Sequence, residues 1–236
     1  MSGNDDVVRI RTQLAELDEL LVFAEILFNR YAAEALADES TAIRRVAAAA
    51  IMRLPGCLRS ISLLARHGQA LDAMNVARTL LEMAVMTLWI GDDDERAAQL
   101  SAKHSKDWAK GLGRIHPYGE PPSEVKALLE QLTADSAGSQ NLNLKACAEE
   151  AVDTPEIKRR GMATYLYNWL YDLLSAAAHG DSRFARLIAT GNEMRFVPSA
   201  LDYGLAAAEY LLIATAPQLG FIDDLTTRLQ KKHRLS

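Results

Sequence analysis

Apolar side chains recur every three or four residues along most of this 236-residue chain. The longest such run covers residues 7–37, with leucines on one side of the pattern and acidic residues on the other. This period matches the 3.6-residue turn of an α-helix and not the two-residue alternation of a strand. The chain has only 7 prolines and 13 glycines, so few positions interrupt such helices. The pattern therefore predicts an all-α fold.

Start and stop signals divide the rest of the chain into further helices. We expect main helices over residues 41–66, 70–90, 92–112, 155–178 and 199–216, and short ones over 123–134, 142–152 and 221–234. Ser40 is a suitable N-cap for the first of these. Pro55-Gly56 is expected to kink or break that helix, and Pro217 to end the helix over 199–216.

No internal repeat and no linker longer than a loop divides the chain. We therefore expect one domain over residues 1–236, a bundle of four to six main helices with short peripheral ones. Within it, the long N-terminal amphipathic helix takes residues 1–39, the core of the bundle 40–220, and the C-terminal helix 221–236. A chain of this length can bury a sizeable core.

Composition and charge are those of a soluble globular protein. The chain is 49% hydrophobic and 24% charged, as is common for soluble globular proteins. Its net charge of −5 argues against a broad nucleic-acid surface and leaves room for a local basic cleft. No signal peptide or uninterrupted 18-residue apolar run is present, and Cys57 and Cys147 lie far apart in the sequence. We expect a cytoplasmic protein with reduced thiols and no membrane contact.

The first candidate site is a line of polar residues in the aromatic-rich segment YLYNWLYDLLSAAAHGDSR, residues 165–183. The line consists of Asn168, Asp172, Ser175 and His179, at spacings of four, three and four. These spacings place all four on one face of a helix that ends at Gly180.

A second line, Asn75, Arg78 and Glu82, runs along the apolar segment 70–90. A carboxylate among apolar residues requires a partner, and Arg78 lies one turn before Glu82. Two interpretations stay open: an internal ion pair that fixes helix packing, or two residues that line a cleft. Our hypothesis is that the two polar lines face each other across the bundle.

His179 is the residue best suited to proton transfer. A helix C-terminus favours a protonated imidazole, so a packing or capping role is the alternative. A histidine beside an arginine can cleave RNA without a metal, because the histidine moves protons and the arginine stabilises the phosphorane charge. The candidate catalytic residues are therefore His179, Arg78 and Glu82, with Asn75, Asn168, Asp172 and Ser175 as binding residues.

Other motifs are missing or weak. The sequence has no metal-ligand spacing of His or Cys and no glycine-rich phosphate loop, so we expect neither a metal nor a cofactor. We interpret His104, Asp107 and Lys103 as solvated helix residues. Trp89, Trp108 and Trp169 are interpreted as core or interface anchors.

Two segments carry a resemblance. DAMNVARTLLEMAVMTLWIGDDDERAAQL, followed later by YDLLSAAAHGD, resembles a bacterial all-helical domain family of unknown function. Its marks are an R-x-x-x-E helix, an acidic turn and a late S-x-x-x-H-G motif, over roughly residues 40–220. The matching positions are Arg78, Glu82, Ser175, His179 and Gly180.

More distantly, a late helix that ends in His-Gly resembles the HEPN superfamily. That resemblance implies dimeric, metal-independent ribonucleases of toxin–antitoxin and phage-defence systems, some of them inactive binding partners. The HEPN motif has an arginine four to six residues before the histidine. Here Leu173, Leu174 and Ser175 precede His179, so Arg78 would have to act from another helix.

Two functional classes remain open from the sequence. One is an RNA-directed enzyme, with His179 as acid or base and Arg78 as phosphate ligand. The other is a non-catalytic helical module that binds a protein partner. A homodimer is expected in either case, because the long N-terminal helix and the aromatic-rich helices offer more apolar surface than one layer of packing needs.

Overall fold

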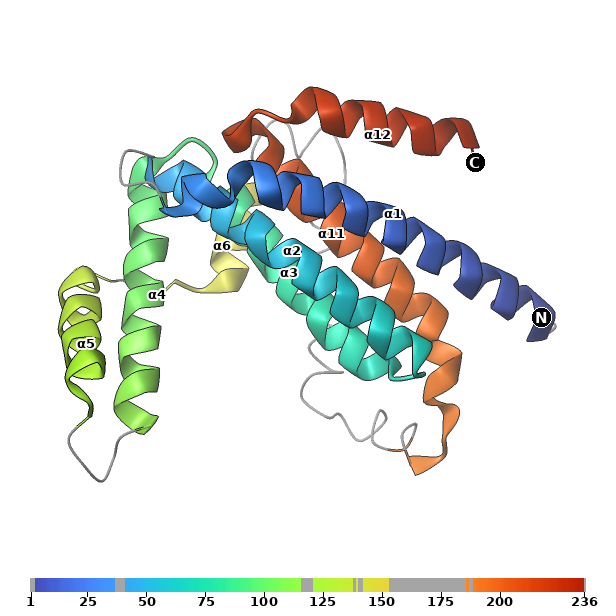
Figure 1. Cartoon of the computed structure of the whole chain (residues 1–236), viewed down its shortest axis with the longest axis horizontal. Helices are drawn as coiled ribbons and strands as arrows, with labels where there is room; N and C mark the ends of the chain where they lie inside the picture. Colours follow the sequence, from blue (N-terminus) through green and yellow to red (C-terminus); the bar gives the residue numbers. More distant parts are fainter. Residues whose placement is uncertain are drawn as a thin grey trace.

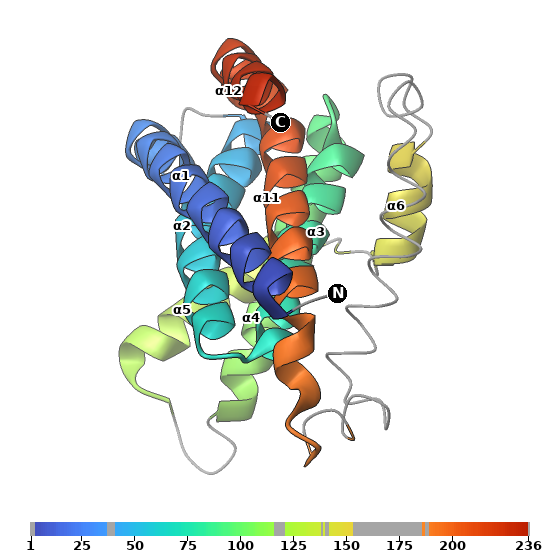
Figure 2. The same cartoon turned by 90° about the vertical axis from the view of Figure 1, so that its right-hand side faces the viewer.

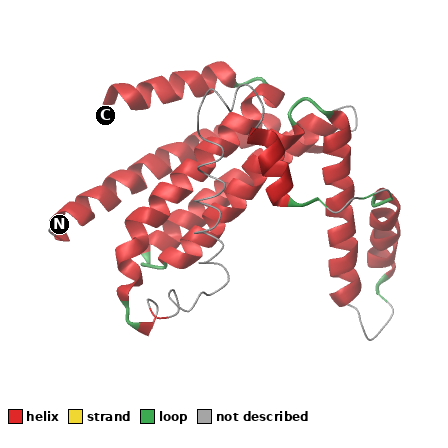
Figure 3. Ribbon diagram, turned by 180° about the vertical axis from the view of Figure 1, so that it is seen from behind, coloured by secondary structure: helices red, strands yellow, loops and turns green. Residues whose placement is uncertain are grey.

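The computed structural model describes residues 3–36, 41–115, 121–137, 139, 142–152, 186 and 189–235. Those residues form eight α-helices and one 3-10 helix, and none of them is in a strand (Figure 3). The α-helices are α1 (Gly3–Leu36), α2 (Ala42–Arg66), α3 (Ala70–Ile90), α4 (Asp94–Ile115), α5 (Ser123–Asp135), α6 (Leu144–Val152), α11 (Val197–Leu219) and α12 (Ile222–Leu235). The 3-10 helix η2 (Asn192–Phe196) precedes α11. The predicted all-α class is confirmed.

Four long helices form the body of the molecule. α3 packs along α11 and α2, and α1 lies across α2 and α11 (Figures 1 and 2). Their shared core is built from leucines and many alanines, whose small side chains let helices approach closely. At Gly204 of α11 the approach is so close that an added Cβ would lie 3.0 Å from Cγ2 of Ile61.

Two prolines do not break or end their helices where the sequence predicts it. α2 continues through Pro55 to Arg66, and α11 continues through Pro217 to Leu219. Pro55 is buried in a well-packed stretch of α2, where tertiary packing offsets the loss of one backbone N–H donor. The α11 helix ends instead where Gly220 adopts a left-handed φ of 81°.

The N-cap of α2 also differs from the prediction. Thr41 occupies that position, and its hydroxyl accepts a hydrogen bond from the backbone N–H of Arg44 at 3.3 Å. Ser40 lies outside the described residues.

α4 and α5 form an arm that leaves the body of the bundle (Figure 1). The first half of α4 is anchored by the buried residues Ala97 and Leu100. Its second half pairs with α5, which has no buried residue.

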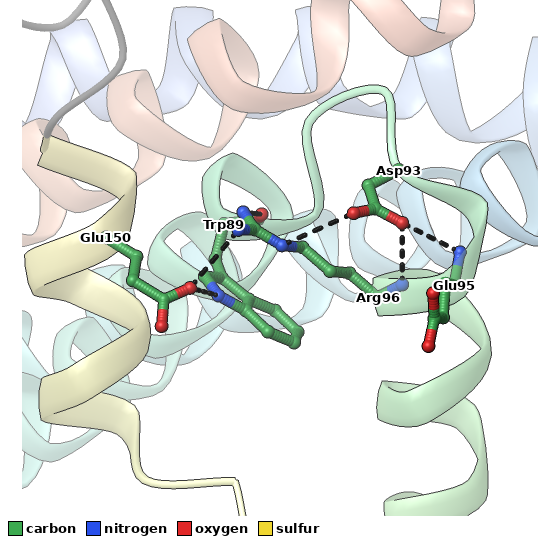
Figure 4. A network of polar contacts seen from close by, with 5 residues as sticks. All are labelled: Trp89, Asp93, Glu95, Arg96 and Glu150. Carbon is green, nitrogen blue, oxygen red and sulfur yellow. Dashed lines mark hydrogen bonds and ion pairs between the residues drawn. The ribbon is translucent and has the colours of Figure 1, made fainter.

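A polar network ties the start of α4 to α3 and α6 (Figure 4). Arg96 donates to the backbone oxygen of Trp89 at 2.8 Å and pairs with Oε2 of Glu150 at 3.2 Å. The indole N–H of Trp89 donates to the same Glu150 oxygen at 2.7 Å. Asp93 caps α4 by accepting hydrogen bonds from the backbone N–H groups of Glu95 and Arg96. This Arg96 network fixes where α4 leaves the bundle.

Among the described helices, two meet the length and hydropathy of a membrane span. They are α2 and α3, with 50% and 56% of their most apolar windows buried inside the bundle. Core helices of a helical bundle meet the same criteria, so the predicted cytoplasmic localisation stays a prediction.

Candidate functional site

A groove of about 850 Å³ lies between α2, α3 and the exposed side of α4. Pockets of roughly 300–1,000 Å³ are typical of small-ligand sites. Its apolar lining includes Val46, Ala49, Met83, Met86, Leu100, Leu142 and Leu144. Its ionisable lining is Arg45 and Arg53 from α2, Glu82 from α3, and Lys103 and His104 from α4.

The charge of this groove is opposite to that of the chain. Among its described lining residues, three basic side chains, Arg45, Arg53 and Lys103, accompany one carboxylate, Glu82. The whole chain carries a net charge of −5. Basic walls around a low-dielectric groove concentrate the electric field and attract anions. The groove is thus the local basic cleft for which the sequence left room.

His104 lies on the α4 wall of the groove. The residue is exposed overall, yet packing around its imidazole lowers the pKa, as does the positive charge of Lys103. Asp107 acts in the opposite direction, and its own carboxylate pairs with Lys103 at 2.8 Å. Because the pKa is below the ordinary value of about 6.5, the imidazole is neutral at pH 7.

Trp108 is one turn further along the same wall. Its side chain is 65% exposed, so Trp108 is not a core anchor, and the alternative role as an interface anchor stays a prediction. Trp89, by contrast, is buried as predicted. A tryptophan exposed at the wall of a basic groove offers a flat apolar face to a ligand. The sequence signal for this position is an aromatic residue in the otherwise polar stretch KHSKDWAK.

Arg78 and Glu82 form the ion pair that the sequence predicts. The Nε of Arg78 donates to Oε1 of Glu82 at 2.8 Å, and the two side chains are 19% and 35% exposed. Glu82 also lines the groove. The pair is thus an ion pair within α3, as the first interpretation states. Its carboxylate also lines a cleft, as the second interpretation states.

Asn75 borders a second opening of about 610 Å³ between α2 and α3. Its Oδ1 atom is buried and has no hydrogen-bond partner among the described residues. Arg53 and Thr79 line both this opening and the larger groove. The face shared by α2 and α3 therefore offers two adjacent depressions on either side of Arg53.

The other polar line falls in a part of the chain that the structure does not describe. Asn168, Asp172, Ser175 and His179 lie outside the described residues, as do Trp169 and Gly180. The hypothesis that the two polar lines face each other therefore stays a prediction.

Thiols and carboxylates do not gather into a metal site in the part of the chain that the structure describes. Cys57 and Cys147 are both free and buried, and burial raises the pKa of each thiol. Arg53 opposes this shift at Cys57, to which it donates a hydrogen bond.

The family model described as a family of unknown function, DUF5677, matches residues 45–194. The chain belongs to the DUF5677 family. The DUF5677 match begins in the first turns of α2 and includes α3 and the whole α4–α5 arm, so nearly all of the groove is family structure. It also spans His179, whereas α1 and α12 lie outside it. No curated protein and no solved structure is significantly similar to the chain. The predicted membership in a family of unknown function is confirmed, and the HEPN resemblance stays a prediction.

Proposed function

We propose that this DUF5677 protein binds single-stranded RNA in the groove between α2, α3 and α4. The observation that carries the proposal is the lining of the groove: three basic side chains against one carboxylate, with the exposed Trp108 at its wall. The proposal takes the protein to be cytoplasmic, where RNA is available.

Proteins that bind single strands combine a basic groove for the phosphates with aromatic faces on which bases stack. Arg45 and Arg53 of α2 are the phosphate ligands in this proposal. Trp108 is the stacking platform on α4, and Met83 and Met86 supply the apolar floor between the two walls. Flat bases and charged phosphates match such a mixed lining better than a purely apolar or purely charged ligand.

The HEPN resemblance supports a finer proposal, metal-independent RNA cleavage in a bacterial defence or toxin system. In it, His179 moves protons and Arg78 stabilises the charge on the phosphorane. Glu82 then has a positioning role, because it holds the guanidinium of Arg78 through the 2.8 Å ion pair.

Binding is tested by fluorescence anisotropy with a labelled 12-nucleotide single-stranded RNA. Arg53→Gln removes a groove cation and is expected to weaken binding about tenfold, the usual effect of losing one charge-assisted contact. Arg59→Gln is the matched control, because Arg59 lies on the same helix but pairs with Glu25. A wild-type protein that does not bind RNA, or equal losses in the two variants, would contradict the proposal.

Cleavage is tested separately, with an end-labelled RNA pool in EDTA. Loss of cleavage in His179→Ala, with thermal stability unchanged, is the result expected for a catalytic histidine. RNA binding without cleavage would leave the binding proposal standing and remove the catalytic one.

A second candidate is the non-catalytic module that binds a protein partner. The apolar part of the groove supports it, since Met83 and Met86 provide the adaptable surface on which partner helices dock. Under this alternative an acidic amphipathic helix, and not RNA, fills the groove. RNA that neither binds nor is cleaved, together with lower stability of His179→Ala, would favour it.

A further inference from the structure

A line of exposed apolar residues runs along the outer face of α1, where a bundle helix is usually polar. Its inner face packs the core through Leu17, Leu20, Ala24 and Leu27, all at most 1% exposed. Helical geometry places Val8, Ala15, Val22 and Ile26 on the opposite side. All four are exposed, with Val8 and Val22 both at 59% and Ile26 at 50%. A helix that packs against its neighbours through one face usually carries polar and charged residues on the opposite face. This apolar stripe therefore indicates a second contact.

Val8, Ala15 and Val22 are seven residues apart. A seven-residue repeat keeps side chains on one line when two helices coil around each other with a left-handed twist. The three positions span about 21 Å of helix, at 1.5 Å per residue. The spacing is therefore that of a helix–helix seam.

We propose that this stripe binds α1 of a second copy of the chain, antiparallel, with the two-fold axis at Ala15. Val8 and Val22 are equidistant from Ala15, so Val8 of one copy then packs on Val22 of the other. Ala15 meets its own symmetry mate, where a methyl group lets the two backbones approach closely. The contact is isologous and closed, as in most homodimers.

The charges beside the stripe favour this orientation. Arg11 precedes Ala15 by four residues, and Asp18 follows it by three, on the same edge of the helix. Antiparallel pairing brings Arg11 of one copy beside Asp18 of the other, and the symmetry forms the pair twice. On the other edge, Thr12 meets Glu19 in the same way. Parallel pairing would instead bring the edge of Arg11 and Asp18 against the edge of Thr12 and Glu19, so that Asp18 would meet the like charge of Glu19.

The neighbouring helices leave the stripe accessible. α2 borders one edge through the Asp18–Arg66 and Glu25–Arg59 ion pairs. α12 borders the other edge, where Arg30 pairs with Asp224 at 2.8 Å. None of the described helices lies over the face between these edges (Figures 1 and 2). The contact is separate from the groove, because no residue of α1 lines the groove.

Sedimentation velocity of the full chain tests the dimer. Wild type is expected to sediment as a dimer at micromolar concentration, and Val22→Glu as a monomer with unchanged helical circular dichroism. Ile222→Glu is the control, since Ile222 is 51% exposed but lies on α12. A monomeric wild type, or a dimer that resists Val22→Glu, would overturn the proposal.

A cysteine at the two-fold axis tests the register. Ala15→Cys is expected to give a disulfide-linked dimer under mild oxidation, because each thiol meets its own mate. Ala33→Cys, exposed on the same side of α1, is 18 residues from the axis and is expected to remain unlinked. The native thiols are both buried and do not interfere. Equal cross-linking of the two variants, or cross-linking of Ala33→Cys alone, would contradict the axis.

Discussion

Arg96 of α4 and Glu150 of α6 approach to 3.2 Å, and Trp89 of α3 donates to the same carboxylate oxygen at 2.7 Å. One carboxylate thereby joins three helices at the base of the α4–α5 arm. The direction of α4, and with it the width of the groove, depends on this junction.

Removal of the Glu150 carboxylate should loosen the junction. Glu150→Ala leaves the buried indole N–H of Trp89 without its acceptor, whereas Arg96 keeps its contacts with Asp93 and with the backbone oxygen of Trp89. We expect a loss of about 1–2 kcal/mol in unfolding free energy, because an unsatisfied buried donor is costly while the half-exposed ion pair contributes little. Chemical denaturation measures it. Glu149→Ala, which breaks only a 3.9 Å contact with Lys145, is the control and should change stability much less.

Trp108 should contribute to RNA affinity without contributing to stability. Trp108→Leu is expected to weaken RNA binding by about 1–3 kcal/mol, the range measured for the loss of a stacked base. Its melting temperature should match that of wild type, since the indole is 65% exposed. Anisotropy titration measures the RNA affinity, and a thermal melt measures the melting temperature. Wild-type affinity in this variant would remove Trp108 from the site.

His104 should make RNA binding pH-dependent. Its pKa is lowered in the free protein, so at pH 7.5 the imidazole is neutral and adds no charge to the groove. Between pH 7.5 and 5.5 we expect RNA affinity to rise as the imidazole gains a proton beside the bound phosphates. The rise should be smaller in His104→Gln. An identical pH profile for the two proteins would contradict this role.

The lowered pKa of His104 also predicts that the stability of the folded protein depends on pH. A histidine whose pKa is lower in the folded than in the unfolded chain contributes stability above pH 6.5. That contribution is lost as the pH falls toward the folded-state pKa. Without RNA, wild type should therefore lose more stability than His104→Gln between pH 7 and 5, as measured by urea denaturation.

The close approach of α11 and α2 should not tolerate a methyl group. In Gly204→Ala the new Cβ would lie 3.0 and 3.1 Å from the Cγ2 and Cδ1 atoms of the fully buried Ile61. We expect a net loss of about 1–2 kcal/mol in unfolding free energy, despite the better helix propensity of alanine. In an Ile61→Ala background the same change should be stabilising. Equal effects in the two backgrounds would show that Ile61 is not the obstacle.

Helical periodicity was sufficient to predict the fold class and most helix positions, because apolar spacing reflects which face each helix buries. It failed at Pro55 and Pro217, where local rules predict a break and tertiary packing maintains the helix. The Arg78–Glu82 pair was predictable because its two residues are one turn apart on one helix. Arg53, His104 and Trp108 come from two helices, and their meeting depends on the angle of α4, which no local pattern in the sequence encodes.

The salt dependence of RNA binding tests the proposed groove most directly. Each neutralised phosphate of a single strand contributes about −0.7 to the slope of log K against log salt concentration. The two proposed phosphate ligands, Arg45 and Arg53, therefore predict a slope of about −1.4 for wild type, and Arg53→Gln should reduce its magnitude by about 0.7. Binding that does not respond to salt, or an unchanged slope in Arg53→Gln, would show that RNA does not occupy the groove between α2, α3 and α4.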